Sequence, residues 1–455
     1  MSAPAALRGG GQPQATLSVA AVVAIIVGIV VGAGIFRMPS LVAGFAANET
    51  VFMLAWLAGG IISLIGALCY AELATAYPSA GGDYHFLTRA YGRNLSFMFG
   101  WARAVVIIPG SIAFLSFLFG DYAVRLFPLG EFGSVIYAAL LAIVLTLVNV
   151  AGIRKGSATQ NWLTILEVGG LLTIIVAGLI VAAPAVAPVV VESVPASADK
   201  PWHTSIGLLM MFVLFTYSGW NESAYISAEV KDARRNMVRA LVFSIIIVTV
   251  LYLLANWAYL RALGLPAMAK SQAVAADLME KAWGPAGATI ISIMVAVSAI
   301  TSANATIIVG ARSNYALGRD WPVLSFLGRW DGVAGTPTTS LLVQGTIALV
   351  LIAIGTFTRK GLETMVDFTN PVFWFFFMLA AASLIVLRVR DPRAERPFKV
   401  PLYPVTPIIF CAVSAYLLWR SLDYARMGSL LGIAVLGLGV PVLMWARRRA
   451  AADAS

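Results

Sequence analysis

Glycine-rich breaks interrupt two hydrophobic segments of this chain, and they offer exposed backbone groups that could bind a ligand. One break falls within residues 28–36 and the other within 215–222. Backbone inside a bilayer can leave the helix only where it lines a protein or water cavity, because lipid cannot satisfy free N–H and C=O groups. Either break alone is explained equally well by glycines that relieve crowding between helices. Matched breaks in the first and sixth spans indicate a transporter's substrate site.

The half-helix ends at these breaks carry partial charges of both signs. In the first break a half-helix starts near Gly34, so its free N–H groups and positive dipole end suit a carboxylate. Carbonyl groups near Val30, and those around Phe215 and Ser218, offer a negative end for an ammonium group. Together the two ends suit a zwitterion with charges one carbon apart, which is an α-amino acid. Glycine lets such a ligand approach the backbone closely, but it does not select the ligand's side chain.

Two acidic residues lie where charge is costly. Glu167 lies inside an apolar segment, where ionisable side chains are expensive and functional by default. Burial would favour its protonated form, so it could load and release H+; it could also bind Na+ or the ammonium of a basic substrate. The structural alternative is that it pairs with Arg103 or another polar group and only holds helices together. Glu222 follows the second break and could contact substrate or cap the inner half-helix, where an acidic residue is stabilising.

The segments that must position these residues are long and apolar. The chain has 455 residues, of which 60% are hydrophobic and only 11% charged. A soluble protein carries about 25% charged residues, and a span of about 20 apolar residues crosses the hydrocarbon core. The sequence therefore predicts an all-α membrane protein with twelve transmembrane helices. They are expected at 16–46, 50–77, 95–124, 133–151, 158–183, 203–230, 238–262, 286–317, 338–357, 361–389, 404–422 and 427–446.

The order of the spans predicts an internal repeat. Spans 1–5 and 6–10 each begin with a broken helix, and an odd number of spans per half inverts the second half. This is a five-plus-five inverted repeat with broken helices 1 and 6, followed by two peripheral helices that are more often dimer contacts than transport elements. A homodimer is therefore left open. The expected boundaries are a tail at 1–15, one transporter domain at 16–449 (repeats at 16–183 and 203–389, peripheral helices at 404–446) and a tail at 450–455.

The net charge of +10 is an orientation signal, because most of the 31 Lys and Arg fall in alternate connections and at the termini. The positive-inside rule then puts both termini on the cytoplasmic side of a multi-pass inner-membrane protein surrounded by lipid. Nucleic acid is not an expected partner. There is no Gly-rich phosphate-binding loop, and Cys69 and Cys411 do not have metal-binding spacing. We expect no cofactor, no metal and no enzymatic activity.

Several motifs resemble bacterial members of the amino acid–polyamine–organocation (APC) superfamily, close to the L-type amino acid transporters. They follow in the expected order along nearly the whole chain. The motifs are Gly32-Ala33-Gly34-Ile35-Phe36, Tyr70-Ala71-Glu72-Leu73 continuing to Tyr77-Pro78-Ser79-Ala80-Gly81-Gly82, Tyr217-Ser218-Gly219-Trp220-Asn221, Glu229-Val230-Lys231 through Arg235-Asn236, Arg312 through Asp320, and Arg396-Pro397-Phe398-Lys399-Val400-Pro401.

The resemblance implies roles for residues at both breaks. Amides of Ala33, Gly34 and Ile35 would bind the substrate carboxylate, and carbonyls of Val30, Phe215 and Ser218 would hold its amino group. Phe215 would gate the site, while Tyr217, Trp220 and Asn221 would shape the pocket for the substrate side chain.

This chain departs from the family pattern at two positions. Many relatives have a hydroxyl residue at the position of Ala33. Several have, at the position of Glu167, a lysine whose ammonium replaces the sodium ion of sodium-coupled transporters.

Three further polar features have alternative interpretations. Arg37 is expected to extend outward along the first span rather than to contact substrate. Glu72, at the end of a span, is expected to be solvated, with a gate salt bridge as the alternative. The small polar cluster 301–304 suits close helix contact, or it could face the site beside Glu167.

The predicted function is secondary active transport of amino acids by alternating access, with Glu167 as the ion-coupling residue for H+, or less favourably for Na+. One alternative is an exchanger of amino acids, cationic amino acids or polyamines without ion coupling. A channel or a membrane sensor is a remote alternative, because there is no ring of repeated pore-lining residues and no soluble signalling domain.

Overall fold

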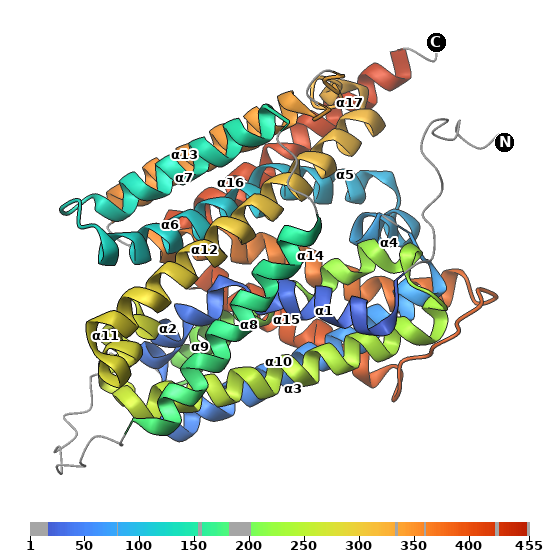
Figure 1. Ribbon diagram of the computed structural model, residues 1–455. Helices are drawn as coiled ribbons and strands as arrows, with labels where there is room; N and C mark the ends of the chain where they lie inside the picture. The colour runs from blue at the N-terminus through green and yellow to red at the C-terminus, as the bar shows by residue number, and fades with distance from the viewer. Residues whose placement is uncertain are drawn as a thin grey trace.

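The computed structural model describes residues 17–79, 81–152, 157–181, 202–332, 335–358, 361–423 and 427–452. Within these ranges the regular secondary structure is helical, apart from two isolated bridges between single residues. The helices form one elongated bundle in which distant parts of the chain lie side by side (Figure 1). The helices and turns are α1 Val19–Val30, η1 Ala33–Phe36, α2 Met38–Phe45, α3 Glu49–Ala76, α4 Gly82–Tyr91, α5 Arg93–Ala102, η2 Arg103–Ile107, α6 Ile108–Leu126, α7 Gly133–Val150, α8 Ser157–Ile180, α9 Trp202–Tyr217, η3 Trp220–Glu229, α10 Ala233–Leu263, α11 Leu265–Lys270, α12 Val274–Asp320, η4 Pro322–Leu324, α13 Thr338–Thr358, α14 Gly361–Arg390, α15 Val405–Asp423, α16 Met427–Gly437 and α17 Gly439–Ala452.

The prediction of an all-α membrane protein is confirmed. Nine helical stretches of the described residues are long and apolar enough to cross a membrane. Every predicted span overlaps a helix, but the two broken segments are not among these nine stretches, and the apolar stretch counted in α8 is only Ile165–Ile180. Twelve spans therefore stay a prediction. The predicted tail at 1–15 lies outside the described residues, whereas α17 continues to Ala452, inside the predicted tail at 450–455.

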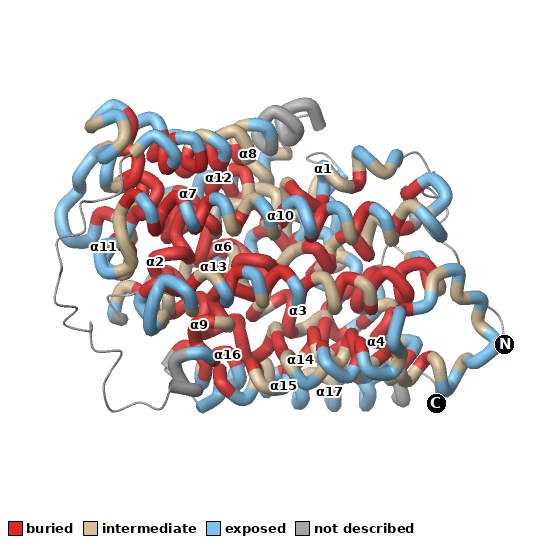
Figure 2. Tube along the Cα trace, turned by 90° about the horizontal axis from the view of Figure 1, so that it is seen from below, coloured by how far each residue is buried: buried red, intermediate tan, exposed pale blue. Residues whose placement is uncertain are grey.

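Burial follows the pattern expected for helices in lipid. Many large apolar side chains are exposed on the outer faces of the bundle, for example on α7, where Leu147 is 56% exposed. The buried residues run through the middle of the bundle from one end to the other (Figure 2). Lipid can cover such an apolar exterior, so the hydrophobic surface is consistent with a membrane environment.

Both predicted helix breaks are present. After α1, Gly32 is extended (φ −64°, ψ −175°), and the short 3₁₀ turn η1 separates it from α2. After α9, Gly219 adopts φ +108°, a conformation that glycine reaches without steric cost. The chain then continues as the 3₁₀ segment η3 rather than as an α-helix.

A third irregularity lies within the long helical stretch 93–126. The turn η2 is a π-helix between α5 and α6, and Pro109 follows it directly. Because proline has no N–H, it cannot hydrogen-bond to the carbonyl one turn earlier, which explains a local widening of the helix. Such π-turns occur frequently at functional sites, and this one begins at Arg103.

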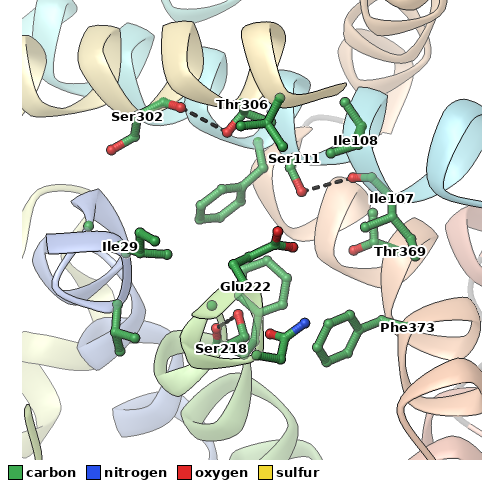
Figure 3. Close-up of a pocket in the computed structure, with 18 of the residues that line it drawn as sticks. Ile29, Ile107, Ile108, Ser111, Ser218, Glu222, Ser302, Thr306, Thr369 and Phe373 are labelled. Carbon is green, nitrogen blue, oxygen red and sulfur yellow. Dashed lines mark hydrogen bonds between the residues drawn. The ribbon is translucent and has the colours of Figure 1, made fainter. Parts of the chain in front are cut away.

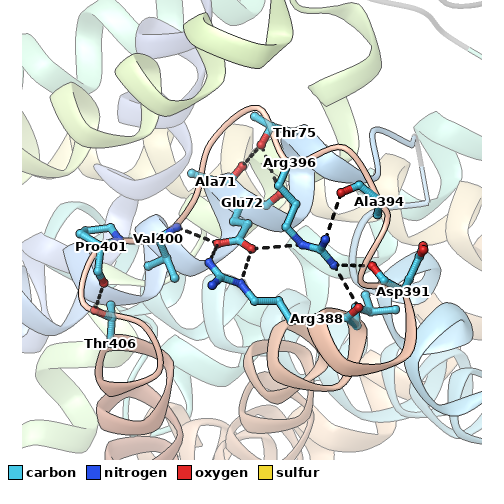
Figure 4. Close-up of polar contacts among 11 residues, drawn as sticks. Ala71, Glu72, Thr75, Arg388, Asp391, Ala394, Arg396, Val400, Pro401 and Thr406 are labelled. Carbon is cyan, nitrogen blue, oxygen red and sulfur yellow. Dashed lines mark hydrogen bonds and ion pairs between the residues drawn. The ribbon is translucent and has the colours of Figure 1, made fainter.

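The α4 end of the bundle is closed by a buried ionic cluster. The carboxylate of Glu72 is 2% exposed and accepts hydrogen bonds from Nε and Nη2 of Arg388, at 2.8 and 2.6 Å, and from the amide of Val400, at 2.7 Å (Figure 4). Arg396 lies 3.6 Å from the same carboxylate. The expectation that Glu72 is solvated is therefore wrong, because its partners come from the last turn of α14 and from the connection after it, which folds over the carboxylate.

The α11 end is tied together by Arg37, which is 4% exposed. Its guanidinium donates to the carbonyl of Ser271 at 3.1 Å and to the side chain of Gln272 at 2.8 Å, and lies 3.9 Å from Asp121. The expectation that Arg37 extends outward is wrong, since its partners lie across the bundle on other elements. The two ends of the bundle thus differ in their polar contacts.

Candidate functional site

A cavity of about 350 Å³ lies between the two breaks. Its lining comes from both broken segments and from α4, α5, η2, α6, α8, α12 and α14. It includes Asp83 of α4 but no residue of α2 or α11, so the cavity extends towards the α4 end. This volume lies within the range typical of small-molecule sites, about 300–1,000 Å³. Figure 3 shows Glu222 and Ser218 facing Ile29 on one side and Ser111 and Phe373 on others.

The two breaks pack directly against each other. A methyl group added to Gly219 would lie 2.9 Å from Cγ2 of Ile29, so the backbone of the second break approaches the first closely. Tyr252 of α10 connects the two breaks: its hydroxyl donates to the carbonyls of Val30 at 2.7 Å and Thr216 at 3.2 Å. The breaks are therefore held in one fixed relationship by a buried side chain.

The predicted carbonyl ligands lie at the cavity, and two already accept hydrogen bonds. Val30, Phe215 and Ser218 all line it. The carbonyl of Val30 accepts from Tyr252, and that of Phe215 accepts from the hydroxyl of Ser218 at 2.6 Å. The Phe215 carbonyl also accepts from the backbone N–H of Ser218 at 3.2 Å. A carbonyl oxygen has two lone pairs, so the Val30 carbonyl retains the capacity for a second donor such as an ammonium, whereas both lone pairs of Phe215 are already used.

The predicted amide ligands begin η1. The first N–H groups of a helix have no partner inside it, and Gly32, which precedes η1, has no side chain to cap them. Gly34 lines the cavity, whereas the side chain of Ile35 is fully buried in the core. The backbone of Ala33 begins the 3₁₀ turn, where its amide is one of the uncapped groups.

Glu167 lines the cavity and is 5% exposed. Its carboxylate accepts a hydrogen bond from the hydroxyl of Ser298 on α12 at 2.7 Å. Among the described residues it has no ion-pair partner; the alternative in which it pairs with Arg103 is wrong, because that guanidinium is engaged elsewhere. Ser302, in the polar cluster noted in the sequence, lines the same cavity beside Glu167.

Another member of that cluster, Asn304, serves helix contact. The side-chain oxygen of Asn304 accepts from Asn149 of α7 at 2.7 Å, which joins α12 to α7. Both alternatives for the cluster 301–304 thus hold, for different residues. Which member faces the site depends on the rotation of α12, which the local sequence does not specify.

Glu222 forms a two-pronged ion pair with Arg103 across the cavity wall. The two guanidinium nitrogens Nη1 and Nη2 donate to the two carboxylate oxygens at 3.0 and 3.1 Å. Nε of Arg103 donates to the hydroxyl of Ser313 at 3.3 Å, and its guanidinium lies 5.0 Å from the ring centre of Tyr225. Charge-assisted bonds with this parallel geometry are among the stronger hydrogen bonds in proteins.

Asn221 lines the cavity and donates from its amide to the carboxylate of Asp83 at 3.3 Å. Asp83 belongs to α4, which lies between two spans, and it is 4% exposed. Burial raises the pKa of Asp83 to about 7, and the neighbouring carboxylate of Glu222 adds to the rise, while Tyr70, Arg103 and Asn221 oppose it. Asp83 therefore titrates near neutral pH.

The predicted aromatic residues divide into two groups. Phe215 lines the cavity and packs edge-on against Phe114, with ring centres 5.3 Å apart. Tyr217 and Trp220 are buried in other clusters: the Tyr217 hydroxyl donates to the carbonyl of Trp56 at 3.0 Å, and Trp220 packs on Tyr70. Neither lines the cavity, because the break rotates successive side chains to different sides of the segment.

Sequence reasoning missed three residues that shape this site: Tyr252, Asp83 and the guanidinium partner of Glu222. No local motif marks Tyr252 as special in the apolar helix α10. A signal for Arg103 was present, because a positive charge inside a span needs a partner, but the sequence did not indicate which carboxylate it would meet. The α14 wall, which includes Thr369 and Phe373, was not anticipated either.

Comparisons with known proteins agree along most of the chain. The sequence model of the amino acid permease family matches residues 17–441. The b(0,+)-type amino acid transporter 1 of Mus musculus is 32% identical over 403 residues, which is 87% of this chain and 80% of that protein. The large neutral amino acids transporter small subunit 2 of Mus musculus is 31% identical over 449 residues, 97% of this chain and 82% of that protein; the human protein of the same name is also 31% identical, over 451 residues, 97% of this chain and 82% of that protein.

Proposed function

Since this chain belongs to the amino acid permease family, a family of membrane transporters rather than enzymes, we propose that it carries amino acids across the inner membrane by alternating access, coupled to H+. The resemblance to the APC superfamily noted in the sequence is confirmed by these relatives. The observation that supports the proposal most strongly is the cavity between two helix breaks that contact each other. Breaks of this kind at the middle of a bundle are typical of secondary transporters.

The backbone at the breaks suits both charged groups of an α-amino acid. The uncapped amides of Ala33, Gly34 and Ile35 would bind the carboxylate. The remaining lone pair of the Val30 carbonyl, with the Ser218 carbonyl, would hold the ammonium, and the Phe215 carbonyl would join them by giving up a hydrogen bond from Ser218. This arrangement would recognise the carboxylate and the ammonium that all α-amino acids share.

Glu167 is the proposed proton carrier. It is buried, it lines the cavity, and in the described part of the chain its carboxylate has a hydroxyl partner but no cation. A buried carboxylate without a counter-charge is stable when protonated and costly when ionised, so its proton uptake would depend on whether the cavity is open to water. Exchange without ion coupling is the second candidate. The Ser298 hydrogen bond favours it, because that bond could hold α8 against α12 without any role in transport.

We propose a twelve-span, five-plus-five inverted repeat for the fold, with both termini cytoplasmic. Epitope tags at each end should be accessible to antibody only from the cytoplasmic side. Homodimerisation through the peripheral helices stays a prediction. The name of one relative describes it as a small subunit, so the mass of the purified complex will decide how this chain assembles.

The experiment is uptake of labelled amino acids and polyamines into proteoliposomes, with and without an inward proton gradient, by wild type and Glu167→Gln. We expect the gradient to drive accumulation in wild type but not in the variant, which keeps exchange. Glu280→Gln, an exposed carboxylate on α12, is the control and should behave as wild type. Transport that needs only internal substrate and survives Glu167→Gln would make the protein an exchanger. No uptake of any amino acid by folded protein would contradict transport itself.

A further inference from the structure

The charged side chains that line the cavity are not equivalent. Among the described lining residues they are Asp83, Arg103, Glu167 and Glu222. Glu222 and Arg103 neutralise each other through two hydrogen bonds, so the pair presents no net charge. We propose that this pair is a charge filter that restricts the substrate side chain to neutral groups, with Arg103 occupying the position that a cationic side chain would need. This inference rests on the proposed function, because it concerns the same cavity.

Arg103 is held more firmly than a substrate ammonium would be. Its side chain is 8% exposed, that of Glu222 is 29% exposed, and Ser313 and Tyr225 fix the guanidinium from two further sides. A lysine or arginine side chain in the cavity would have to displace a tethered, pre-oriented cation from both carboxylate oxygens. Such a displacement is unfavourable, because the displaced guanidinium would remain buried without its partner.

The remaining carboxylates do not offer an alternative site for a cationic side chain. Asp83 accepts from Asn221, and near neutral pH part of the population is protonated. Glu167 lies near Tyr252 and Ser302, at the side of the cavity next to the first break. The head group of every amino acid would bind there, so Glu167 cannot distinguish one substrate side chain from another.

The rest of the lining fits a neutral side chain. Much of it is formed by apolar and aromatic residues. They are Ile107, Ile108, Phe114, Leu115, Phe373 and Phe376. Burying an alkyl or aromatic side chain against them is favourable, at about 25 cal/mol per Å². An anionic side chain would instead be close to the carboxyl groups of Asp83 and Glu222.

The test is competition against labelled L-leucine uptake by unlabelled L-lysine and L-norleucine, which have the same carbon chain and differ by one ammonium group. In wild type we expect lysine to be at least about tenfold weaker than norleucine. Arg103→Gln frees Glu222, so competition by lysine relative to norleucine should improve at least about tenfold. The double variant Arg103→Gln/Glu222→Gln removes both charges and should exclude lysine again. Arg234→Gln, in an exposed ion pair outside the cavity, should leave the ratio unchanged.

Two results would contradict the charge filter. One is equal competition by lysine and norleucine in wild type. The other is an unchanged ratio of lysine to norleucine competition in an Arg103→Gln variant that still transports leucine. If Arg103→Gln does not give folded protein, the deciding variant is Glu222→Gln, which leaves Arg103 unpaired. In this variant L-glutamate should compete better, relative to L-glutamine, than it does in wild type. An unchanged ratio there also contradicts the filter. Absence of uptake of leucine and every other amino acid by folded wild type would contradict the proposed function instead.

Discussion

The hydroxyl of Tyr252 lies 2.7 Å from the carbonyl oxygen of Val30, the last residue of the first half-helix, and donates a hydrogen bond to it. The same hydroxyl reaches the carbonyl of Thr216 next to the second break. A buried side chain of α10 thus satisfies backbone groups that both breaks leave without a helical partner, and it couples the two breaks mechanically.

Tyr252→Phe should lower transport strongly while the protein still folds. Leaving a buried carbonyl without its donor costs about 1–3 kcal/mol, and 1.4 kcal/mol corresponds to about tenfold in an equilibrium. We expect the initial rate of uptake to fall about tenfold. Tyr259→Phe is the matched control, since Tyr259 is a buried tyrosine of the same helix whose hydroxyl has no hydrogen-bond partner among the described residues. Equal loss in both variants would contradict the coupling role.

Gly219→Ala should disable the second break. An alanine there is strained because φ is +108°, and its methyl group would lie 2.9 Å from Ile29. The left-handed conformation alone costs about 1–2 kcal/mol for a residue with a Cβ atom. We expect loss of uptake and a lower thermal midpoint in detergent. Gly44→Ala, at an exposed helical position with open space around it, should be neutral or slightly stabilising.

Asp83 should make stability depend on pH. Its pKa is about 7 in the folded protein, above its ordinary value of 3.8, so the folded state binds the proton more tightly than the unfolded state. Stability from this group is full below pH 3.8 and is lost as pH rises towards 7. Asp83→Asn should therefore raise the thermal midpoint relative to wild type at pH 8, and the difference should shrink at pH 5. A difference that is constant across this range would mean that Asp83 does not titrate there.

The Glu72 cluster should contribute to stability far more than an exposed ion pair. Glu72→Gln leaves Arg388 and Arg396 with an uncharged partner; breaking a fully buried pair costs about 3–5 kcal/mol, and less is expected here because Arg388 is 19% exposed. Glu395→Gln is the comparison. Its pair with Arg234 is 2.5 Å long, but both side chains are more than half exposed, and such pairs contribute about 0–1 kcal/mol. Thermal midpoints of the two variants measure the contrast, and equal midpoints would contradict it.

The class of the protein and the positions of its two helix breaks could be predicted from the amino-acid sequence. Apolar length specifies membrane helices because lipid leaves the backbone no other way to satisfy its hydrogen bonds. Glycine position specifies the breaks for the same reason, so residues 28–36 and 215–222 could be identified without coordinates. Family motifs then identified the superfamily.

The pairing of the polar side chains became visible only in the folded bundle. Arg103 joins Glu222 rather than Glu167, and Arg37 and Glu72 are buried rather than solvated. In an all-round apolar span, the hydrophobic pattern does not fix the rotation of the helix, so the sequence does not show which face a single polar residue takes. Partners distant in sequence, such as Tyr252 and Val30, meet only when helix rotation and packing bring them together.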